Sequence, residues 1–256
     1  MQVATDIFRI LSQRGTSFKP YHYELLIAAQ VRAGDMRTAL TVVCIMHAVN
    51  MKPKMASLAP FTLYLQEDPA RAAEAFTILK ELKEERQVPT VAVNCILASL
   101  VKHNKHEDVI TTYKSLHRIC KQGPTVDTFN TIFRSCHRNN DKKTAMFFAA
   151  EMVELKIRPD SLTYDRLILT CIREKDYEDA FRYYKEMMHS GYQPRLGTWS
   201  LMVQVCCNAR DKRAFELVQK MEELGFKTSR SVQYLQENWP EKADEIFGLH
   251  SSTLDT

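Results

Sequence analysis

The stretch EMVELKIRPDSLTYD, residues 151–165, joins the end of one expected helix to the start of the next. Met152 belongs to an apolar run, Pro159 ends that run, and Thr163 is a short polar residue able to cap a following helix. Closely similar stretches occur 35 residues later, as GYQPRLGTWS, and 35 residues earlier, as KQGPTVDTFN. The segment therefore marks the border between two copies of one repeated unit.

Three columns of residues share this period. Prolines recur at steps of 36, 35, 35 and 35 residues, and a small residue and a long apolar residue follow at nearly constant offsets. Self-similarity at such a period is typical of stacked supersecondary units. The columns are Pro53, Pro89, Pro124, Pro159 and Pro194; Ala39, Ala75, Val109, Ala145, Ala180 and Ala214; and Met46, Leu82, Leu116, Met152, Met187 and Met221.

The composition indicates a folded, all-helical chain. Of 256 residues 45% are hydrophobic, only seven are glycine, and no Asn-Gly or Asp-Gly hairpin signal is present. The longest apolar stretches, such as LTVVCIM at residues 40–46, are far shorter than the roughly twenty residues of a membrane span, so no span is expected. The net charge of +4 permits a polyanionic partner, and seven cysteines without a CxxC pair favour a reducing compartment.

Each period contains two amphipathic segments, which we term helix A and helix B. Helix A follows the capping residue and is expected to run for about twelve residues. A polar break follows, such as RNNDKK or REKDYED, and helix B begins after it. Ala145, Ala180 and Ala214 fall on the first turn of helix B, where a small side chain lets two helices approach closely. Since one hairpin cannot bury its apolar face alone, the hairpins are predicted to stack into an α-solenoid.

The period also sets the expected boundaries. Residues 1–19 match helix B and are predicted to be a half repeat; their start, MQVATDIFRILSQR, is interpreted as a structural helix rather than a transit peptide because it contains Asp6. Pro60 should shorten or shift helix A of the second unit. The predicted units are 20–54, 55–89, 90–125, 126–160, 161–195 and 196–229, followed by a degenerate capping helix and acidic tail at 230–256.

These units resemble the pentatricopeptide repeat. The resemblance rests on helix A openings such as VDTFNTIFRSCHR and SLTYDRLILTCIR, and on ends such as EMVELKIRPD and EMMHSGYQPR. It covers residues 20–229 and is most specific at 126–195. It implies a right-handed α-solenoid that binds single-stranded RNA in organelles, mostly mitochondria, with one base read per repeat by two or three side chains. The expected location is therefore the mitochondrial matrix.

The resemblance also implies base-reading positions. One reader follows the aromatic residue of helix A, and the other is the last residue of the repeat. Only the pair Asn130 with Asp160 is similar to a combination that the family uses for a definite base, uracil. An acidic side chain such as that of Asp165 would repel the RNA phosphates if it faced a groove that holds them. The carried-over pairs are Asn94 with Thr125, Asn130 with Asp160, Asp165 with Arg195, Ser200 with Ser229 and Glu24 with Lys54, while Ala59 with Pro89 would read nothing.

A basic residue recurs near the end of helix A in four units. These residues, predicted to contact RNA phosphates, are Arg32, Lys102, Arg138 and Arg173. The alternative is that each complements the dipole at the end of its own helix. Residues 101–143 add a local excess of basic over acidic residues, which favours RNA at the middle of the solenoid.

Other recurrent side chains are expected to be structural. The aromatic residues Phe129, Tyr164 and Trp199 could stack on bases but are assigned to the core. Cys136, Cys171 and Cys206 lie 35 residues apart, one per stacked helix, and are expected to be buried side chains rather than metal ligands. His103 and His106 are expected to be solvated residues of an inter-helix turn.

The sequence lacks the common catalytic signatures, including a Walker loop, a dinucleotide fingerprint, a GxSxG elbow and a zinc deaminase motif. No catalytic residue, metal site, cofactor or small-molecule substrate is therefore expected. The leading hypothesis is a non-catalytic single-stranded RNA-binding solenoid acting in mitochondrial RNA stability, processing or translation. The alternative is a protein-binding scaffold, such as a subunit associated with the mitochondrial ribosome or an assembly factor of a respiratory complex.

Overall fold

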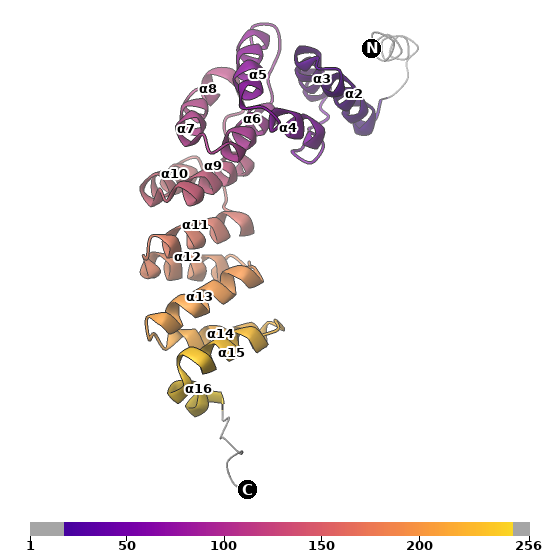
Figure 1. Cartoon of the computed structure of the whole chain (residues 1–256). Helices are drawn as coiled ribbons and strands as arrows, with labels where there is room; N and C mark the ends of the chain where they lie inside the picture. The colour runs from indigo at the N-terminus through magenta and orange to yellow at the C-terminus, as the bar shows by residue number, and fades with distance from the viewer. Residues whose placement is uncertain (1–17, 248–256) are drawn as a thin grey trace. The chain divides into compact units, whose positions relative to one another are not determined.

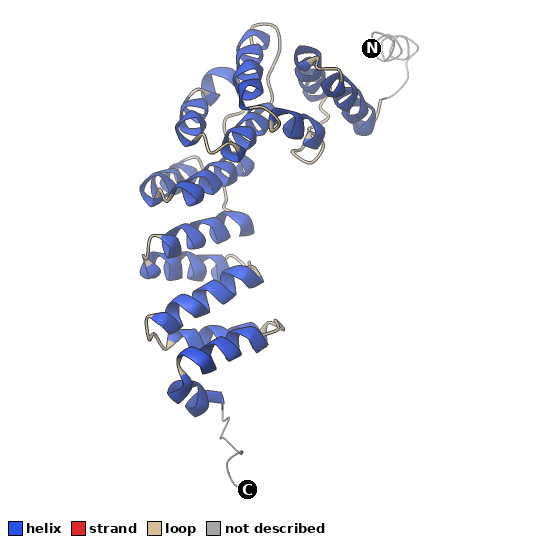
Figure 2. Ribbon diagram, viewed as in Figure 1, coloured by secondary structure: helices blue, strands red, loops and turns tan. Residues whose placement is uncertain are grey.

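A computed structural model describes residues 18–247, and all regular secondary structure in that range is helical (Figure 1, Figure 2). The all-α prediction is therefore confirmed. The chain divides into two compact units between Arg158 and Pro159, within the stretch EMVELKIRPDSLTYD of residues 151–165. Nearly all of the predicted half repeat at 1–19, with the expected helix over its first residues, lies outside the described range.

The first unit consists of helical hairpins. Each helix A contacts the next helix A along the chain, from α2 through α4 and α6 to α9. The helices in the A position are α2 (Pro20–Arg32), α4 (Ala59–Leu65), α6 (Thr90–Lys102) and α9 (Val126–Asn139). Those in the B position are α3 (Met36–Ala48), α5 (Pro69–Leu82), α7 (His106–Lys114) with α8 (Leu116–Ile119), and α10 (Lys142–Glu154).

The second unit repeats this arrangement. Helix α11 contacts α13, and α13 contacts α15. The segment expected to hold one capping helix contains two helices that contact each other, α15 and α16; its last nine residues, 248–256, lie outside the described range. The helices are α11 (Ser161–Arg173), α12 (Tyr177–His189), α13 (Leu196–Asn208), α14 (Arg213–Glu223), α15 (Ser229–Asn238) and α16 (Pro240–Phe247).

Two elements of the first unit depart from the regular pattern. Helix α4 has only 7 residues and carries Pro60 in its first turn, as expected for a residue that lacks the backbone N–H needed further along a helix. The helix B of the next hairpin is interrupted at Ser115, between α7 and α8. The Ser115 hydroxyl donates to the Thr111 carbonyl at 3.2 Å, which offers the backbone an alternative to continued helix.

The turns between helix A and helix B share one local design in four hairpins, those before α3, α10, α12 and α14. A residue with positive φ is followed by an aspartate whose carboxylate caps helix B. Asp141 accepts from the Thr144 N–H at 2.9 Å, and Asp176 accepts from the Asp179 N–H at 3.1 Å. The positive-φ residue before the cap is Gly34, Asn140, Lys175 or Arg210. A lysine or arginine in this conformation costs about 1–2 kcal/mol, so the tight turn must be held by the packing of both helices.

The repeated core positions are buried as expected. Ala145, Ala180 and Ala214 are at most 1% exposed, which allows the close approach of helices A and B. Phe129, Tyr164 and Trp199 are also buried, so their assignment to the core is confirmed and they are not free to stack on bases. The cysteines at the equivalent sites, Cys136, Cys171 and Cys206, are buried free thiols.

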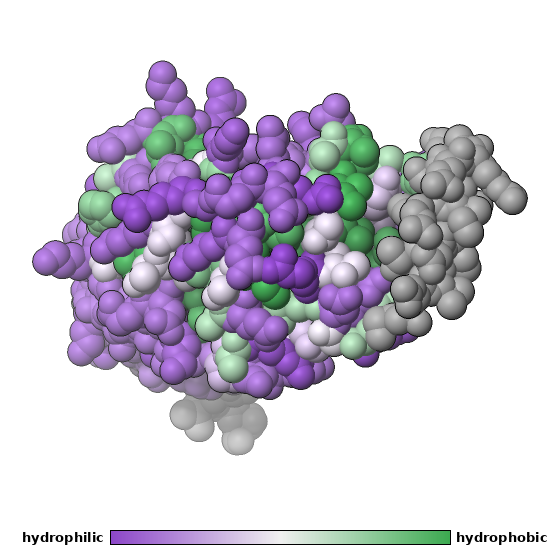
Figure 3. Space-filling model, turned by 90° about the horizontal axis from the view of Figure 1, so that it is seen from above, coloured by the Kyte–Doolittle hydropathy of each residue, from purple (hydrophilic) through white to green (hydrophobic). Residues whose placement is uncertain are grey.

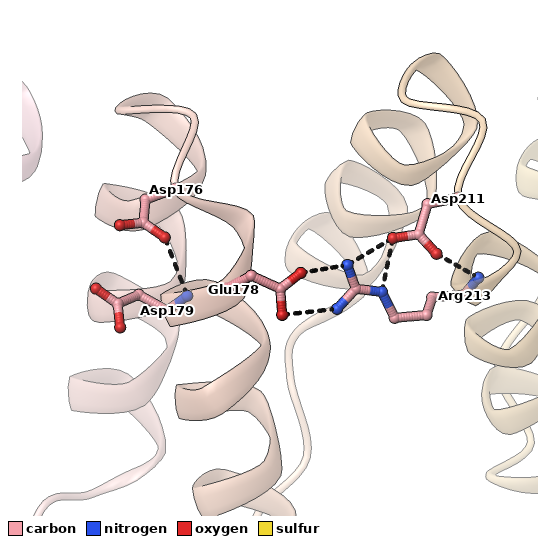
Figure 4. A network of polar contacts seen from close by, with 5 residues as sticks. All are labelled: Asp176, Glu178, Asp179, Asp211 and Arg213. Carbon is pink, nitrogen blue, oxygen red and sulfur yellow. Dashed lines mark hydrogen bonds and ion pairs between the residues drawn. The ribbon is translucent and has the colours of Figure 1, made fainter.

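An arginine joins neighbouring hairpins in the second unit (Figure 4). The Arg213 guanidinium donates to Glu178 of α12 at 2.6 Å and to Asp211, which precedes α14, at 2.7 Å. It also lies over the Phe181 ring, 4.0 Å from the ring centre. These hydrogen bonds raise the pKa of Arg213 and hold the pKa of the Asp211 carboxyl below 3.8, its ordinary value.

His106 is not the solvated turn histidine that the sequence suggested. Its side chain is only 13% exposed; Nδ1 lies 2.8 Å from Ser135 Oγ and Nε2 lies 3.2 Å from Asp141 Oδ2. Burial alone would raise the pKa of Asp141, but hydrogen bonds from Thr144 and the contact with His106 hold it below its ordinary value. These contacts join α7 to Ser135 within α9, 29 residues away, and to Asp141 just after α9, 35 residues away.

The two aspartates predict a loss of stability in acid. Their pKa values are lower in the folded than in the unfolded chain, so they stabilise the fold above the ordinary pKa and lose this contribution as pH falls through the folded value. We expect the urea midpoint to fall steeply from about pH 5 to about pH 2. Asp211→Asn should flatten this fall, whereas Asp108→Asn, at an exposed site on α7, should leave it unchanged. An identical pH dependence in all three proteins would contradict this account.

Candidate nucleic-acid interface

A groove of about 580 Å³ opens at the N-terminal ends of helices α6 and α9 in the first unit. This volume is within the usual range of ligand sites, about 300–1,000 Å³. The groove contains both members of one predicted base-reading pair, Asn94 and Thr125, together with Lys54 from another pair. The lining residues that the argument uses are His47, Lys52, Lys54, Asn94, Gln122, Thr125 and Asp127.

Asn94 has a defined orientation in this groove. Its Oδ1 accepts from the Thr128 hydroxyl at 2.8 Å, while its Nδ2 donates to Thr125 Oγ1 at 3.3 Å. Thr128 is itself held by the Thr125 N–H, which donates to Thr128 Oγ1 at 3.0 Å. The carbonyl of the Asn94 amide therefore points into the protein and its NH₂ group points towards Thr125. Asn94 is only 1% exposed, so the exposed Thr125 is the member of the pair that a ligand in the groove can reach, and Asn94 holds it in place.

The pair of Asp165 and Arg195 also comes together, in the second unit. Arg195 Nε lies 3.2 Å from Asp165 Oδ2, and the Arg195 N–H donates to Asp165 Oδ1 at 3.3 Å. The Asp165 side chain is 3% exposed, whereas that of Arg195 is 66% exposed. The cost expected for an acid exposed to RNA phosphates therefore does not arise from the Asp165 carboxylate, while base reading by this pair stays a prediction. The acid is covered, and the group that faces solvent is a guanidinium.

The remaining reader pairs are not joined in the same way. Asn130 is buried in the first unit and Asp160 belongs to the second, so their pairing stays a prediction. Asp160 caps α11, accepting from the Thr163 N–H at 2.8 Å. Ser200 is half-buried on α13 and Ser229 is exposed at the start of α15; the structure, which describes both, places no hydrogen bond between them.

The four residues predicted to contact phosphates lie in the last turns of their helices, and their side chains are exposed. Arg138 Nη1 donates to the Val101 carbonyl in the last turn of α6 at 2.8 Å, so it also satisfies a helix end of the neighbouring hairpin. Arg32 and Lys102 occupy the last residues of α2 and α6, and Arg173 ends α11 in the second unit. A continuous row of these charges along both units remains a prediction.

Three groove residues were missed by sequence reasoning. Lys52 lies in the loop between α3 and α4, and His47 near the end of α3 is bonded to Gln122, with 3.2 Å between His47 Nε2 and Gln122 Nε2. His47 and Gln122 are 75 residues apart in the chain. No spacing rule relates such residues, and only the packing of three successive hairpins brings them together.

The chemistry of the described surface is polar. The face drawn in Figure 3 is largely hydrophilic, with hydrophobic residues in separate groups. Within residues 18–247, no helix has the length and apolar character required to cross a membrane. The same range holds no cluster of three or more His, Cys, Asp or Glu side chains suited to a metal ion.

The buried ion pair of the second unit gives a stability prediction. Arg195→Ala should lower the free energy of unfolding by about 1–3 kcal/mol, because it leaves the buried Asp165 carboxylate without its cation. Adding Asp165→Asn should recover part of the loss. Arg182→Ala is the matched control, since the Arg182–Asp179 pair is exposed and should contribute less than about 1 kcal/mol. Urea unfolding measures all four proteins; equal losses for Arg195→Ala and Arg182→Ala would contradict the prediction.

Comparison with family models supports the repeat assignment. The model described as "Pentatricopeptide repeat-containing protein" matches residues 1–116, and the model "Mitochondrial splicing apparatus component" matches residues 72–189. The mitochondrial 15S rRNA processing factors CCM1 of Candida dubliniensis and Candida albicans are each 26% identical over 171 residues. These matches cover 64% of this chain and 22% of each relative, so the chain spans about a fifth of the length of these curated relatives.

Solved structures show the same fold. The pentatricopeptide repeat protein PPR10 from maize is 16% identical with a TM-score of 0.54, over 99% of this chain and 37% of that one. The pentatricopeptide repeat domain of protein-only RNase P 1 from Arabidopsis thaliana, solved in complex with tRNA, is 17% identical with a TM-score of 0.57, over 73% of this chain and 98% of that one. The repeat period, the helical hairpins and these likenesses agree: the chain has the helical-repeat fold of these structures, and its first 116 residues match the pentatricopeptide repeat model.

Proposed function

We propose that this chain is a non-catalytic single-stranded RNA-binding module that acts in mitochondrial RNA processing, stability or translation. The observation that carries the proposal is the groove in which Asn94 and Thr125 meet beside lysine side chains. The names of the similar proteins supply the context, since one relative is a mitochondrial 15S rRNA processing factor and one matching model is a mitochondrial splicing component. We place its site of action in the mitochondrial matrix.

The groove is suited to a base rather than to a duplex. Sequence-specific proteins recognise RNA mainly where single-stranded bases can be splayed out and hydrogen-bonded at their edges. The Asn94 side chain is buried and its amide bonds both Thr128 and Thr125, so it can orient the Thr125 hydroxyl towards an edge of a base. Thr125 is exposed and its hydroxyl can donate or accept. Together they form a small hydrogen-bonding site that needs no rearrangement of the helices.

The Arg195–Asp165 pair supports a second type of contact. Because Asp165 neutralises and positions one edge of the guanidinium, the remaining N–H groups of Arg195 can bind a phosphate or a base carbonyl. We propose that this repeat contributes affinity through the guanidinium and that Asp165 only orients it.

The non-catalytic proposal is supported by the burial, within the described residues, of a contact chain that resembles a catalytic triad. Ser135 is 1% exposed although its hydroxyl contacts His106, which in turn contacts Asp141. A nucleophile must reach a reacting carbon or phosphorus atom, which this buried hydroxyl cannot do in the folded chain. The three residues are better understood as a structural link between hairpins.

RNA binding can be tested directly with the whole chain. We expect it to bind a labelled random pool of single-stranded RNA, and the triple variant Lys102→Ala, Arg138→Ala, Arg173→Ala to bind more weakly. If each residue contacts one phosphate, the slope of log affinity against log salt should fall by about 2, at about 0.7 for each contact. Filter binding at two salt concentrations measures both quantities.

The matched control removes three exposed lysines from helices B, as Lys114→Ala, Lys143→Ala, Lys185→Ala, and should bind nearly as well as the native chain. No RNA binding by the native chain would contradict the proposal and favour the protein-scaffold alternative. Equal losses in the two triple variants would show that the ends of helices A hold no phosphates.

A further inference from the structure

The groove beside Asn94 contains two lysines that the repeat pattern does not place at phosphate positions. Lys52 and Lys54 come from the loop between α3 and α4, and both side chains are exposed. We propose that Lys52 and Lys54 bind a phosphate of the RNA nucleotide whose base lies at Asn94 and Thr125. The inference rests on the proposed function and adds a phosphate site to it.

The loop between α3 and α4 forms this part of the groove. Helix α4 begins only at Ala59, which leaves residues 49–58 as a loop that runs past the N-terminal end of α6. Along residues 52–55 of the loop, exposed and half-buried side chains alternate, as they do in an extended chain. Lys52 and Lys54 therefore share the exposed side of the loop. Both precede residue 55, where the repeat period starts the second unit, so they would lie in the loop even if helix A had its full length.

The loop is anchored before the two lysines by the Met51 N–H, which donates to the Met46 carbonyl at 3.1 Å, and after them by two apolar residues. Leu58 is fully buried, and Met55 Sδ lies 3.9 Å from the Cys95 thiol of α6. On the other wall of the groove, the Thr90 hydroxyl donates to the Gly123 carbonyl at 2.7 Å, which ties the loop before α9 to α6. The His47–Gln122 contact closes the same wall. Anchoring on both sides presents the lysines to the groove with little further loss of chain entropy on binding.

The charge in the groove favours an anion. Lys52 and Lys54 carry the positive charges, and Asp127 in the first turn of α9 is the acid among the lining residues. His47 adds a ring nitrogen that a hydrogen bond to Gln122 holds in place. Two ammonium groups against one carboxylate leave a net positive site, which suits a phosphate better than a neutral peptide segment.

Distance separates this site from the phosphate positions at the ends of helices A. Lys102 is eight residues beyond Asn94 on α6, which corresponds to about 12 Å along the helix axis. Lys52 and Lys54, in contrast, line the same groove as Asn94. A nucleotide whose base lies at Asn94 and Thr125 therefore has these two lysines as its nearest cations, while Lys102 would serve another part of the RNA backbone.

The test uses the whole chain and the labelled random pool of single-stranded RNA. The double variant Lys52→Ala, Lys54→Ala should bind at least about tenfold more weakly, and its salt slope should fall by about 1.4, the value for two phosphate contacts. The control Lys80→Ala, Lys83→Ala removes two exposed lysines from α5 and should bind like the native chain. Since all four side chains are exposed, all variants should retain the native helical circular dichroism and melting temperature.

A second readout locates the RNA. Photocrosslinking with 4-thiouridine-substituted RNA should label a peptide from residues 49–58 or 90–94 in the native chain, and this label should be lost in the Lys52→Ala, Lys54→Ala variant. If the native chain binds RNA but this variant binds equally well, or if both double variants lose affinity alike, the phosphate site is disproved and the proposed function stands. If the native chain itself binds no RNA, the proposed function fails first.

Discussion

Burial of the apolar face of helix A between its own helix B and the next helix A is the interaction on which the rest of this chain depends. Trp199, Phe129 and Tyr164 occupy equivalent places in that interface, and Ala145 and Ala214 allow the close approach of the paired helix. Because each hairpin completes the core of its neighbour, the N-terminal ends of successive helices A lie side by side within a unit. The polar residues at those ends are therefore brought together by apolar packing elsewhere.

Because apolar packing elsewhere places these helix ends, the polar residues at the candidate site can differ from one hairpin to the next. Asn94 with Thr125 forms a hydrogen-bonded pair that presents the Thr125 hydroxyl, whereas Asp165 with Arg195 forms an ion pair that presents a guanidinium. The two pairs occupy equivalent junctions between hairpins, one in each unit, and neither disturbs the core beneath it. The shortened α4 carries this variation further, since losing part of one helix A leaves residues 55–58 in the loop that lines the groove.

The fold could be predicted because its determinants repeat. Pro159, the small residue Ala145 and the aromatic Phe129 each recur at one period, so errors at a single position do not alter the assignment. The buried cysteines followed from the same argument, since Cys136 and its equivalents occupy one place on stacked helices.

Side-chain partnerships at the junctions could not be predicted in this way. His106 was expected in solvent but contacts Ser135 and Asp141, and the ion pair that buries Asp165 beneath Arg195 was not foreseen when the two were paired as base readers. Such contacts depend on rotamers and on residues that occur in only one hairpin, so they leave no periodic signal. Lys52 was overlooked for the same reason, because it lies where the repeat is irregular.

The central claim is that bases of a single strand are recognised at the junctions between hairpins. Selection of preferred sequences from a random RNA pool, carried out with the native chain and with Asn94→Ser, tests it most directly. The shorter side chain cannot bond both Thr128 and Thr125 as the Asn94 amide does, so the Thr125 hydroxyl loses its orientation. The preference should therefore change at one position of the selected sequence and persist at the others. An identical preference at every position, with unchanged affinity, would contradict the account.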